Sequence, residues 1–363
     1  MSDAVQLETF AAGTETAVDV AGIECQLQQL WRLAAESERD PSRRAITRAC
    51  LFSLVVYCET EADRDQATAT IGTLTSRHPC RAIVLLVQPE LPQDELSASI
   101  SAHCHLAGGG DKQVCCEQIS IRAGGHGVGQ LTGALLPLLE SDVPTVIWWQ
   151  GNFLECPELF GRLMANADRL LFDSSTWPPG PWQLTGLAMA LADHGPRWFA
   201  DLSWTRLNQW RALTAACFDD PVQRAELARL ESVAIIHGRG PGAALRAGLF
   251  GGWLAAQLGW TPREAMARIQ RQVCDDDEPQ AASAGLLAVD LKSPSATFSL
   301  RKNHGAHTAT VVVSTAVACG LPRTCALQPL DDASLISQEL DHLSPHTVYE
   351  RALQIAAALG AAG

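Results

Sequence analysis

Short apolar runs alternate with amphipathic stretches along most of this chain. Runs such as 51–58 (LFSLVVYC) and 81–88 (RAIVLLVQ) are rich in β-branched residues, which is typical of strands buried on both faces of a sheet. Between these runs, apolar positions recur at helical spacing, as in 61–77. A Gly-rich loop is expected before the next strand, 114–122. The repeated strand–helix units predict an α/β fold with a mostly parallel sheet and flanking helices on both faces.

The alternation ends after Trp260. A predicted helix over 262–274 and an acidic turn precede three short strand patterns (GLLAVDLK, ATFSLRKN and TATVVVST), which predict a C-terminal antiparallel β-meander from about residue 283. A last helix is expected over about 344–359. Because the chain exceeds the size at which one core stops growing, we expect two α/β domains, 23–155 and 156–363, after a flexible tail (1–22).

The charge balance narrows the classes of partner. The chain has 27 Lys and Arg against 40 Asp and Glu, a net charge of −13, and no dense basic run. Nucleic acid and anionic membranes are therefore not expected partners. The most apolar stretch, 131–149, is interrupted by Glu140, Asp142 and two prolines, and the N-terminus lacks a basic segment followed by an apolar run. These features favour a cytoplasmic protein.

Polar residues follow four of the predicted strands: Gln150, Asp173 with Ser174, Asp201, and His237-Gly238-Arg239. If these strands are neighbours in one parallel sheet, their ends line one edge, where ligands and partners bind. The alternative is that the Asp and Ser side chains cap the helices that follow. Trp148 and Trp149 are adjacent in a strand and point to opposite faces, and a sheet covered on both sides buries both.

The segment DLSWTRLNQWR (201–211) predicts the end of a strand and the start of a helix with two occupied faces. Trp204, Asn208 and Arg211 share one face by their spacing, whereas Trp210 lies on another. Arg206 and Arg211 then need acceptors, and Asp201 or Asp173 could supply one. A structural Asp–Arg lock and a partner-binding surface both fit this pattern.

Signals for a nucleotide site are weak. The loops 123–129 (AGGHGVG) and 238–242 (GRGPG) stand between a predicted strand and a predicted helix, but neither has the G-x-G-x-x-G spacing. Tight-turn glycines are the default interpretation, although both loops could present helix N-terminal amides to an anion.

Signals for metal or redox chemistry are also weak. The cluster 103–105 (HCH) and the pair His304 and His307 lack the second half of a zinc site. Most of the twelve cysteines are expected to be small buried hydrophobic residues. Cys115 and Cys116 form a vicinal pair on a strand, and a redox role for them is not supported by spacing. We expect no catalysis, no metal and no cofactor.

Several segments together resemble the OpcA family. They occur in the family's order within residues 45–260, and the elements DLSW…RL…WR and VPTVIWW…G are the most specific. The segments are RHPCRAIVL (77–85), CCEQISI (115–121), DVPTVIWWQG (142–151), RLLFDSS (169–175), DLSWTRLNQWR (201–211) with CFDD (217–220), and GGWLAAQLGW (251–260).

The resemblance implies a non-catalytic effector that binds glucose-6-phosphate dehydrogenase and promotes its assembly or allosteric activation in the oxidative pentose phosphate pathway. In cyanobacteria the family's effect is tied to redox state, but no cysteine here matches a regulatory one. The alternative is a sugar-phosphate or nucleotide binding protein, or a cryptic enzyme, using the strand C-terminal edge. The candidate binding residues, from the family motifs and strand ends, are Trp148, Trp149, Gln150, Asp173, Ser174, Asp201, Trp204, Arg206, Trp210, Arg211 and Arg239.

Overall fold

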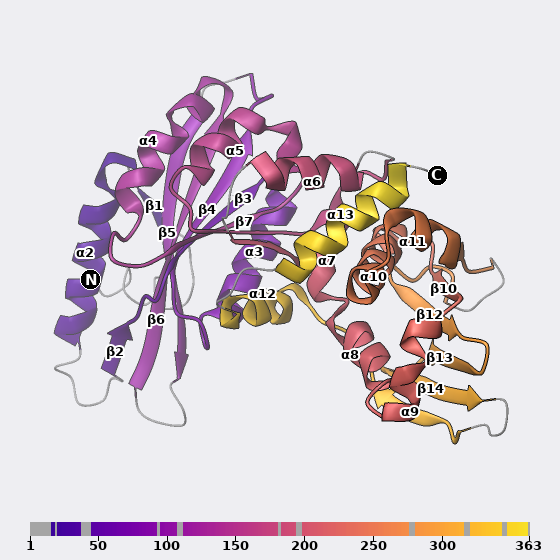
Figure 1. Cartoon of the computed structure of the whole chain (residues 1–363). Coiled ribbons are helices and arrows are strands. Elements are labelled where there is room, and N and C mark those ends of the chain that lie inside the picture. Colours follow the sequence, from indigo (N-terminus) through magenta and orange to yellow (C-terminus); the bar gives the residue numbers. More distant parts are fainter. Residues whose placement is uncertain are drawn as a thin grey trace. The chain divides into compact units, whose positions relative to one another are not determined.

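The chain folds into two compact units, which are described separately (Figure 1). Unit 1 contains the residues up to Phe172 together with Asp332–Leu343, and unit 2 contains Asp173–Asp331 together with the residues from Ser344. The division comes later in the chain than the expected boundary after residue 155. The computed structural model describes residues 16–18, 20–37, 45–92, 95–106, 112–180, 183–193, 198–275, 280–315, 320–342 and 347–361.

A mainly parallel sheet forms the centre of unit 1. Within unit 1 its strands follow the order β1-β5-β6-β4-β3-β7-β8, and β2 pairs with β6. The pairs β1–β5 and β5–β6 are antiparallel, and the others are parallel. The strands are β1 (Thr16–Val18), β2 (Ala45–Arg48), β3 (Ser53–Cys58), β4 (Arg81–Gln88), β5 (Glu95–Leu106), β6 (Lys112–Gly124), β7 (Thr145–Trp149) and β8 (Arg169–Phe172).

Burial along the strands of unit 1 follows the apolar runs. Every residue of β3 and β7 is buried, as expected of strands covered on both faces. Strand β5 corrects the expected Gly-rich loop: Ala98, Ile100 and Ala102 are buried at period two, and the strand pairs with β6 along its length. Of the expected flexible tail, residues 1–15 lie outside the described residues, and Thr16–Val18 pair with β5.

The helices of unit 1 flank this sheet (Figure 1). One of them, α12, comes from the C-terminal part of the chain and lies beside α3, where Arg77 pairs with Asp341 at 2.6 Å and Gln66 donates to Asp332 at 2.9 Å. The helices are α2 (Ile23–Ser37), α3 (Glu61–Leu74), α4 (Leu131–Leu135), α5 (Pro157–Met164), α12 (Asp332–Asp341) and the 3-10 turns η1 (Val20–Gly22), η2 (Gly125–Gln130), η3 (Leu136–Leu138) and η4 (Phe153–Glu155).

Unit 2 contains a second sheet with the strand order β11-β10-β12-β13-β14-β15. The predicted antiparallel meander is confirmed, because β12 to β15 pair with their sequence neighbours. Two expectations are wrong. Strand β10 belongs to this sheet, and the predicted helix over 262–274 ends at Arg268. The strands are β10 (Ser232–His237), β11 (Ile269–Val273), β12 (Leu286–Lys292), β13 (Ala296–Lys302), β14 (Thr308–Thr315) and β15 (Arg323–Ala326).

The early end of that helix has a tertiary cause. Thr261 and Glu264 form a capping box that starts α11 (Pro262–Arg268) as the sequence predicts. The next five residues, IQRQV, pair in parallel register with β10, with Ile269 opposite Val233. The open edge of β10 therefore takes these residues as a strand, and local helical propensity is overridden.

The remaining elements of unit 2 carry the candidate site. Helices α10 and α13 lie against each other in Figure 1. No helix among the described segments is both long and apolar enough to cross a bilayer. The elements are η5 (Ser174–Thr176), α6 (Gln183–Asp193), β9 (Trp198–Asp201), α7 (Leu202–Thr205), α8 (Asn208–Ala216), α9 (Pro221–Ala225), η6 (Leu227–Arg229), α10 (Ala243–Leu258) and α13 (Thr347–Ala361).

Candidate functional site

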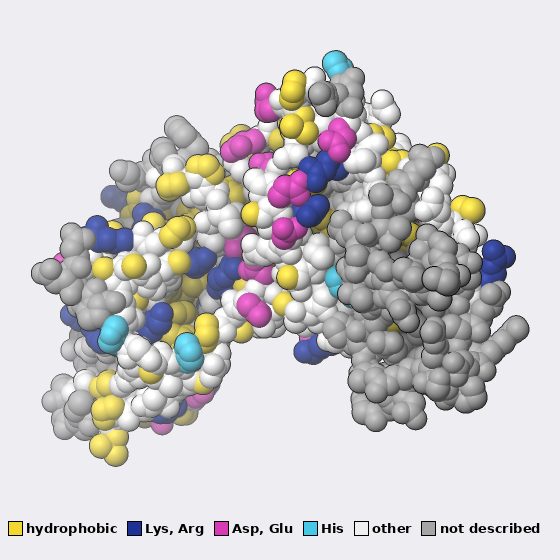
Figure 2. All heavy atoms as spheres, turned by 180° about the vertical axis from the view of Figure 1, so that it is seen from behind, with side chains coloured by type: hydrophobic (Ala, Val, Ile, Leu, Met, Phe, Trp, Pro, Cys, Tyr) yellow, Lys and Arg dark blue, Asp and Glu magenta, His cyan; other side chains and the backbone are white. Residues whose placement is uncertain are grey.

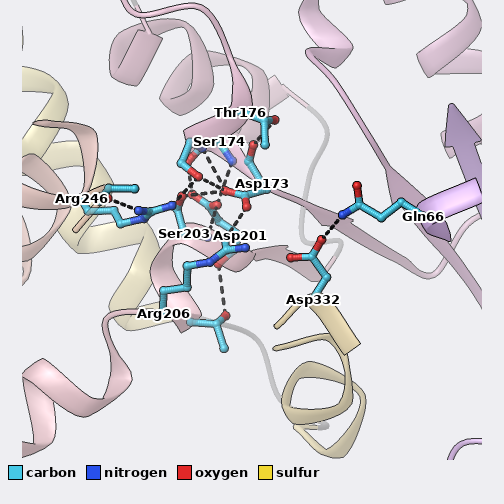
Figure 3. A network of polar contacts seen from close by, with 12 residues as sticks. Gln66, Asp173, Ser174, Thr176, Asp201, Ser203, Arg206, Arg246 and Asp332 are labelled. Atoms are coloured by element: carbon cyan, nitrogen blue, oxygen red, sulfur yellow. Dashed lines mark hydrogen bonds and ion pairs between the residues drawn. The ribbon is translucent and has the colours of Figure 1, made fainter. Parts of the chain in front are cut away.

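Two carboxylates, Asp201, which is buried, and Asp173, whose side chain is 13% exposed, form the centre of a polar network in unit 2 (Figure 3). Each one caps the short helix that follows it. Asp173 accepts from the Ser175 amide at 3.0 Å, and Asp201 accepts from the Ser203 amide at 2.9 Å. The N-cap interpretation of these strand-end acids is therefore confirmed.

Asp201 is 1% exposed and is held by four hydrogen bonds. The amide and hydroxyl of Ser174 donate to it at 3.1 and 2.6 Å, the Ser203 amide donates at 2.9 Å, and the Tyr349 hydroxyl donates at 3.0 Å. Burial raises the pKa of Asp201 to about 6, and the neighbouring Asp173 charge adds to the rise despite these donors. Asp201 is therefore protonated at higher pH than an exposed aspartate.

Asp173 has the opposite balance. Burial alone would raise the pKa of Asp173, but the Arg206 guanidinium and the hydroxyls of Ser175 and Ser203 hold it below its usual value. Arg206 forms an ion pair with Asp173, and the two hydroxyls donate to it at 2.5 and 2.8 Å. This is the Asp–Arg lock that the sequence left open, with Asp173 as the acceptor for Arg206.

Arg246, from α10, joins the network from a second side (Figure 3). Its guanidinium donates to the Ser175 hydroxyl at 2.7 Å and to the carbonyl of Ala284. Burial lowers the pKa of Arg246, while the charges of Asp173 and Asp201 oppose that shift. Two acids and two guanidinium groups from separate elements therefore compensate one another inside unit 2. Neither Arg246 nor Tyr349 was predicted, because no local pattern links them to positions 173 and 201.

The segment 201–211 has both faces occupied, as its spacing predicts. The Arg211 guanidinium stacks on the Trp204 ring at 3.5 Å, donates to the Trp204 carbonyl at 2.8 Å and contacts Asn208. Trp204 and Trp210 are only 4% and 5% exposed. Of the motif residues, Trp204, Trp210, Asp201 and Ser174 point to the interior, so the geometry favours a structural role for them.

Trp148, Trp149 and Gln150 lie in unit 1, at the end of β7. Both indoles are buried, as predicted, and Trp149 stacks on Tyr57 with ring centroids 3.8 Å apart. The backbone amide of Gln150 donates to the backbone carbonyl of Tyr57 at 3.1 Å. The side-chain oxygen of Gln150 is buried without a hydrogen-bond partner among the described residues.

Arg239 does not share an edge with the other strand ends, because β10 belongs to the second sheet. The prediction of one common edge is therefore wrong for this residue. Arg239 donates to the carbonyl of Cys274 at 3.2 Å and lines a pocket of about 720 Å³ in unit 2. A second pocket of about 270 Å³ is lined by Arg206 and Trp210.

The glycine loops owe their glycines to packing. A Cβ on Gly127 would overlap the carbonyl oxygen of Glu95, and one on Gly238 would overlap that of Ser283. The amides of residues 238, 239 and 240 donate to backbone carbonyls at 3.0, 2.7 and 3.0 Å, so they are not available to cradle a phosphate. The first amide of α10, that of Ala243, also donates to a backbone carbonyl, that of Gly240, at 3.1 Å.

The histidine and cysteine clusters do not assemble a metal centre within the described residues. His103 Nε2 is 2.9 Å from Gln118 Oε1, and the side chain of His105 lies outside the described residues. Cys115 is disulfide-bonded. Its neighbour Cys116 is a free thiol on a buried part of β6, and burial raises its pKa to about 11.

Comparisons with known proteins agree on a family. The model of the glucose-6-phosphate dehydrogenase subunit N-terminal domain (OpcA_G6PD_assem) matches residues 72–188, and that of the C-terminal domain (OpcA_G6PD_C) matches residues 197–353. A "Putative OxPP cycle protein OpcA" of Synechocystis is 30% identical over 54% of this chain and 41% of that protein. The Nostoc punctiforme protein of the same name is 33% identical over 51% of this chain and 39% of its own.

The chain spans about two fifths of the length of these curated relatives. Among solved structures, an aldose-aldose oxidoreductase of Caulobacter crescentus covers 86% of this chain and 98% of its own, with a TM-score of 0.43 and 10% identity, a likeness too low to inform fold or activity. The two domain models match in order, and the relatives share one name. The chain therefore belongs to the OpcA family, whose domains are described as those of a glucose-6-phosphate dehydrogenase subunit.

Proposed function

We propose that this protein is a non-catalytic effector that binds glucose-6-phosphate dehydrogenase and promotes its assembly or allosteric activation. The observation that carries the proposal is the match of both domain models of a dehydrogenase subunit, in order, to residues 72–188 and 197–353. The relatives' name places them in the OxPP cycle, which agrees with such a role in the oxidative pentose phosphate pathway.

The internal bonding of the polar network supports a non-catalytic role. Asp173 is committed to Arg206, and Asp201 accepts four hydrogen bonds from unit 2 itself. A general base needs an oxygen that can reach a substrate proton, and a carboxylate with its oxygens already engaged by protein donors is poorly placed for that task. The network instead fixes the ends of β9, α7 and α10 against one another.

The surface offers a protein partner both signs of charge. On the face in Figure 2, acidic and basic side chains are interspersed among hydrophobic ones over the described residues. On α3, Arg64 pairs with Glu61 at 3.1 Å and with Asp65 at 2.7 Å. Mixed charge of this kind favours recognition of a protein surface with a complementary pattern over recognition of a uniformly charged polymer.

An effector can activate an enzyme only by binding its active form more tightly than its inactive form. The test therefore adds the purified chain to the cognate glucose-6-phosphate dehydrogenase. We expect co-elution in size-exclusion chromatography with light scattering, together with a lower KM or a higher kcat. An unrelated acidic protein, serum albumin at the same concentration, is the control for crowding and charge. Unchanged KM, kcat and oligomer mass would refute the proposal.

The effect on the dehydrogenase is further proposed to depend on redox state. The disulfide of Cys115 is a feature of unit 1 that a reductant would change. The adjacent Cys116 thiol is buried and poorly reactive, because burial raises its pKa. Activation should change reversibly on reduction, and Cys115→Ser should respond no further to reductant. Equal activation with and without dithiothreitol would remove redox control but leave binding itself untouched.

A further inference from the structure

A pocket of about 720 Å³ lies within unit 2, between the loop after β10, the first turn of α10, strand β11 and the segment that follows Ser175. Its size is in the range of small-molecule sites. We propose that this pocket binds a phosphate ester of a polyhydroxylated small molecule. The proposal goes beyond the dehydrogenase-effector function, because it needs no partner protein.

Positive charge gathers in this pocket although the chain is acidic. Arg239 and Arg271 line it, and the described residues of its lining include no Asp or Glu. The chain as a whole has 40 acidic against 27 basic residues, so a lining with arginines alone departs from the average surface. The Arg271 guanidinium reaches from β11 towards α10, where it would be 3.4 Å from a Cβ placed on Gly248. An anion at the start of α10 is therefore within the field of this guanidinium.

The first turn of α10 supplies directional donors. This 16-residue helix has Gly242 as its N-cap, with φ 72°, and no side chain caps it. Ala243, Ala244 and Leu245 line the pocket. The Ala243 amide donates to the Gly240 carbonyl at 3.1 Å, but the next two amides, of Ala244 and Leu245, have no partners within the helix, and the helix dipole favours negative charge there. The lack of a capping side chain leaves the place that a phosphate oxygen would occupy.

His237 points to a hydroxylated ligand. It lines the pocket, is only 6% exposed, and its Nδ1 is 2.7 Å from the Gly238 carbonyl oxygen. A carbonyl can only accept, so Nδ1 carries a proton. When the ring is neutral, Nε2 then carries the lone pair, and the contact of Nδ1 with Gly238 is the hydrogen bond that this side chain forms within the described residues. Since His237 lines the pocket, a sugar-like hydroxyl bound there can donate to Nε2.

Isothermal titration calorimetry on the full chain alone tests the proposal. The probes are glucose 6-phosphate and its two halves, glucose and inorganic phosphate. We expect glucose 6-phosphate to bind more tightly than either half. Arg271→Gln should weaken its binding about tenfold or more, because it removes a charge-assisted contact. Arg263→Gln is the matched control, since Arg263 is an exposed arginine on α11 that does not line the pocket.

Each other outcome overturns the proposal in a defined way. No heat with any probe removes the site. Equal affinities for Arg271→Gln and Arg263→Gln place the binding elsewhere. If glucose binds as tightly as glucose 6-phosphate, the pocket does not recognise the phosphate group. If inorganic phosphate binds as tightly as glucose 6-phosphate, the pocket does not recognise the hydroxylated part. Because no dehydrogenase is present, these results are independent of the effector function.

Discussion

At the scale of single residues, Asp173 and Asp201 show how one network shifts the pKa values of two carboxylates in opposite directions. Both are largely removed from solvent, but Asp173 faces the Arg206 guanidinium, whereas Asp201 faces hydroxyls, amides and the Asp173 charge. The pKa of Asp173 is therefore held down and that of Asp201 is raised to about 6. Burial alone would have raised both, so the placement of one arginine decides the difference.

The raised pKa of Asp201 predicts a pH dependence of stability. Between about pH 4 and pH 6 the folded chain keeps this proton while the unfolded chain releases it, so the contribution of Asp201 to the free energy of unfolding falls as pH rises. Asp201→Asn should remove this contribution, which amounts to about 2 kcal/mol. Urea unfolding at a series of pH values measures it as the difference between wild type and variant.

Asp219→Asn is the control for that experiment, because Asp219 is exposed. Asp173 does not interfere in this window. Because its pKa is lowered, its contribution to the free energy of unfolding is lost only as the pH falls below about 4, the usual pKa of an aspartate. A difference between wild type and Asp201→Asn that stays constant from pH 4 to pH 6.5 would show that Asp201 does not titrate there.

The Asp173–Arg206 pair should show coupling in a double-mutant cycle. Arg206→Met leaves a largely buried carboxylate without its cation and should lower the free energy of unfolding by about 3 kcal/mol, at the low end for a buried pair because Arg206 and Asp173 are 22% and 13% exposed. Adding Asp173→Asn should then cost less than it does alone, with a coupling of at least about 1 kcal/mol. Additive losses in urea unfolding would mean that the two side chains act separately.

At the scale of elements, α10 shows why a helix can need glycine. Gly252 faces α13, and a Cβ there would overlap the carbonyl oxygen of Ala352 and lie 2.9 Å from the Ala356 methyl. Gly248, one turn earlier, faces only the ends of the Leu184 and Arg271 side chains, at 3.3 and 3.4 Å. The first position meets rigid backbone, whereas the second meets atoms that can move.

These two glycines give a matched pair of variants on one helix. Gly252→Ala should lower the free energy of unfolding by about 3 kcal/mol, because overpacking outweighs the better helix propensity of alanine. Gly248→Ala should change it by less than about 1 kcal/mol. Thermal and urea unfolding of both variants measure the contrast, and equal effects would argue against close contact of α10 with α13.

Elements whose sequence pattern is strong were predicted, and those that depend on a distant partner were not. The buried strands β3, β4 and β7 follow from uninterrupted apolar runs, and the meander follows from short alternating runs with tight turns. Strand β11 does not, because residues 262–274 read as one helix until β10 offers a free edge. The sequence also did not predict that β10 belongs to the second sheet, because an apolar run does not specify which sheet it joins.

At the scale of the whole molecule, the chain does not divide into two continuous segments. Helix α12, Asp332–Asp341, belongs to unit 1 although the chain on both sides of it belongs to unit 2. Arg169 and Glu339 pair within unit 1 at 2.8 Å, with 5% and 4% of their side chains exposed. Unit 1 therefore depends on residues from the C-terminal part of the sequence.

Glu339→Gln should destabilise unit 1 selectively. The variant leaves the Arg169 guanidinium buried without a carboxylate, which should cost about 3 kcal/mol. Hydrogen exchange read peptide by peptide should become faster in β7 and β8 and stay unchanged in β13 and β14. Glu350→Gln, on an exposed position of α13, is the control. Faster exchange in both units, or in neither, would contradict the assignment of α12 to unit 1.

The sequence by itself determined the fold class, the meander, the family, the burial of Trp148 and Trp149, and the shared face of Trp204 and Arg211. These features depend on periodicity and on side chains close together in the chain. Only the tertiary structure decided that Asp173 pairs with Arg206, that Arg246 and Tyr349 complete the network, and that Arg239 faces a pocket of its own. Those contacts join residues up to 148 positions apart, and no local pattern encodes which distant side chain will fill a buried hydrogen-bond site.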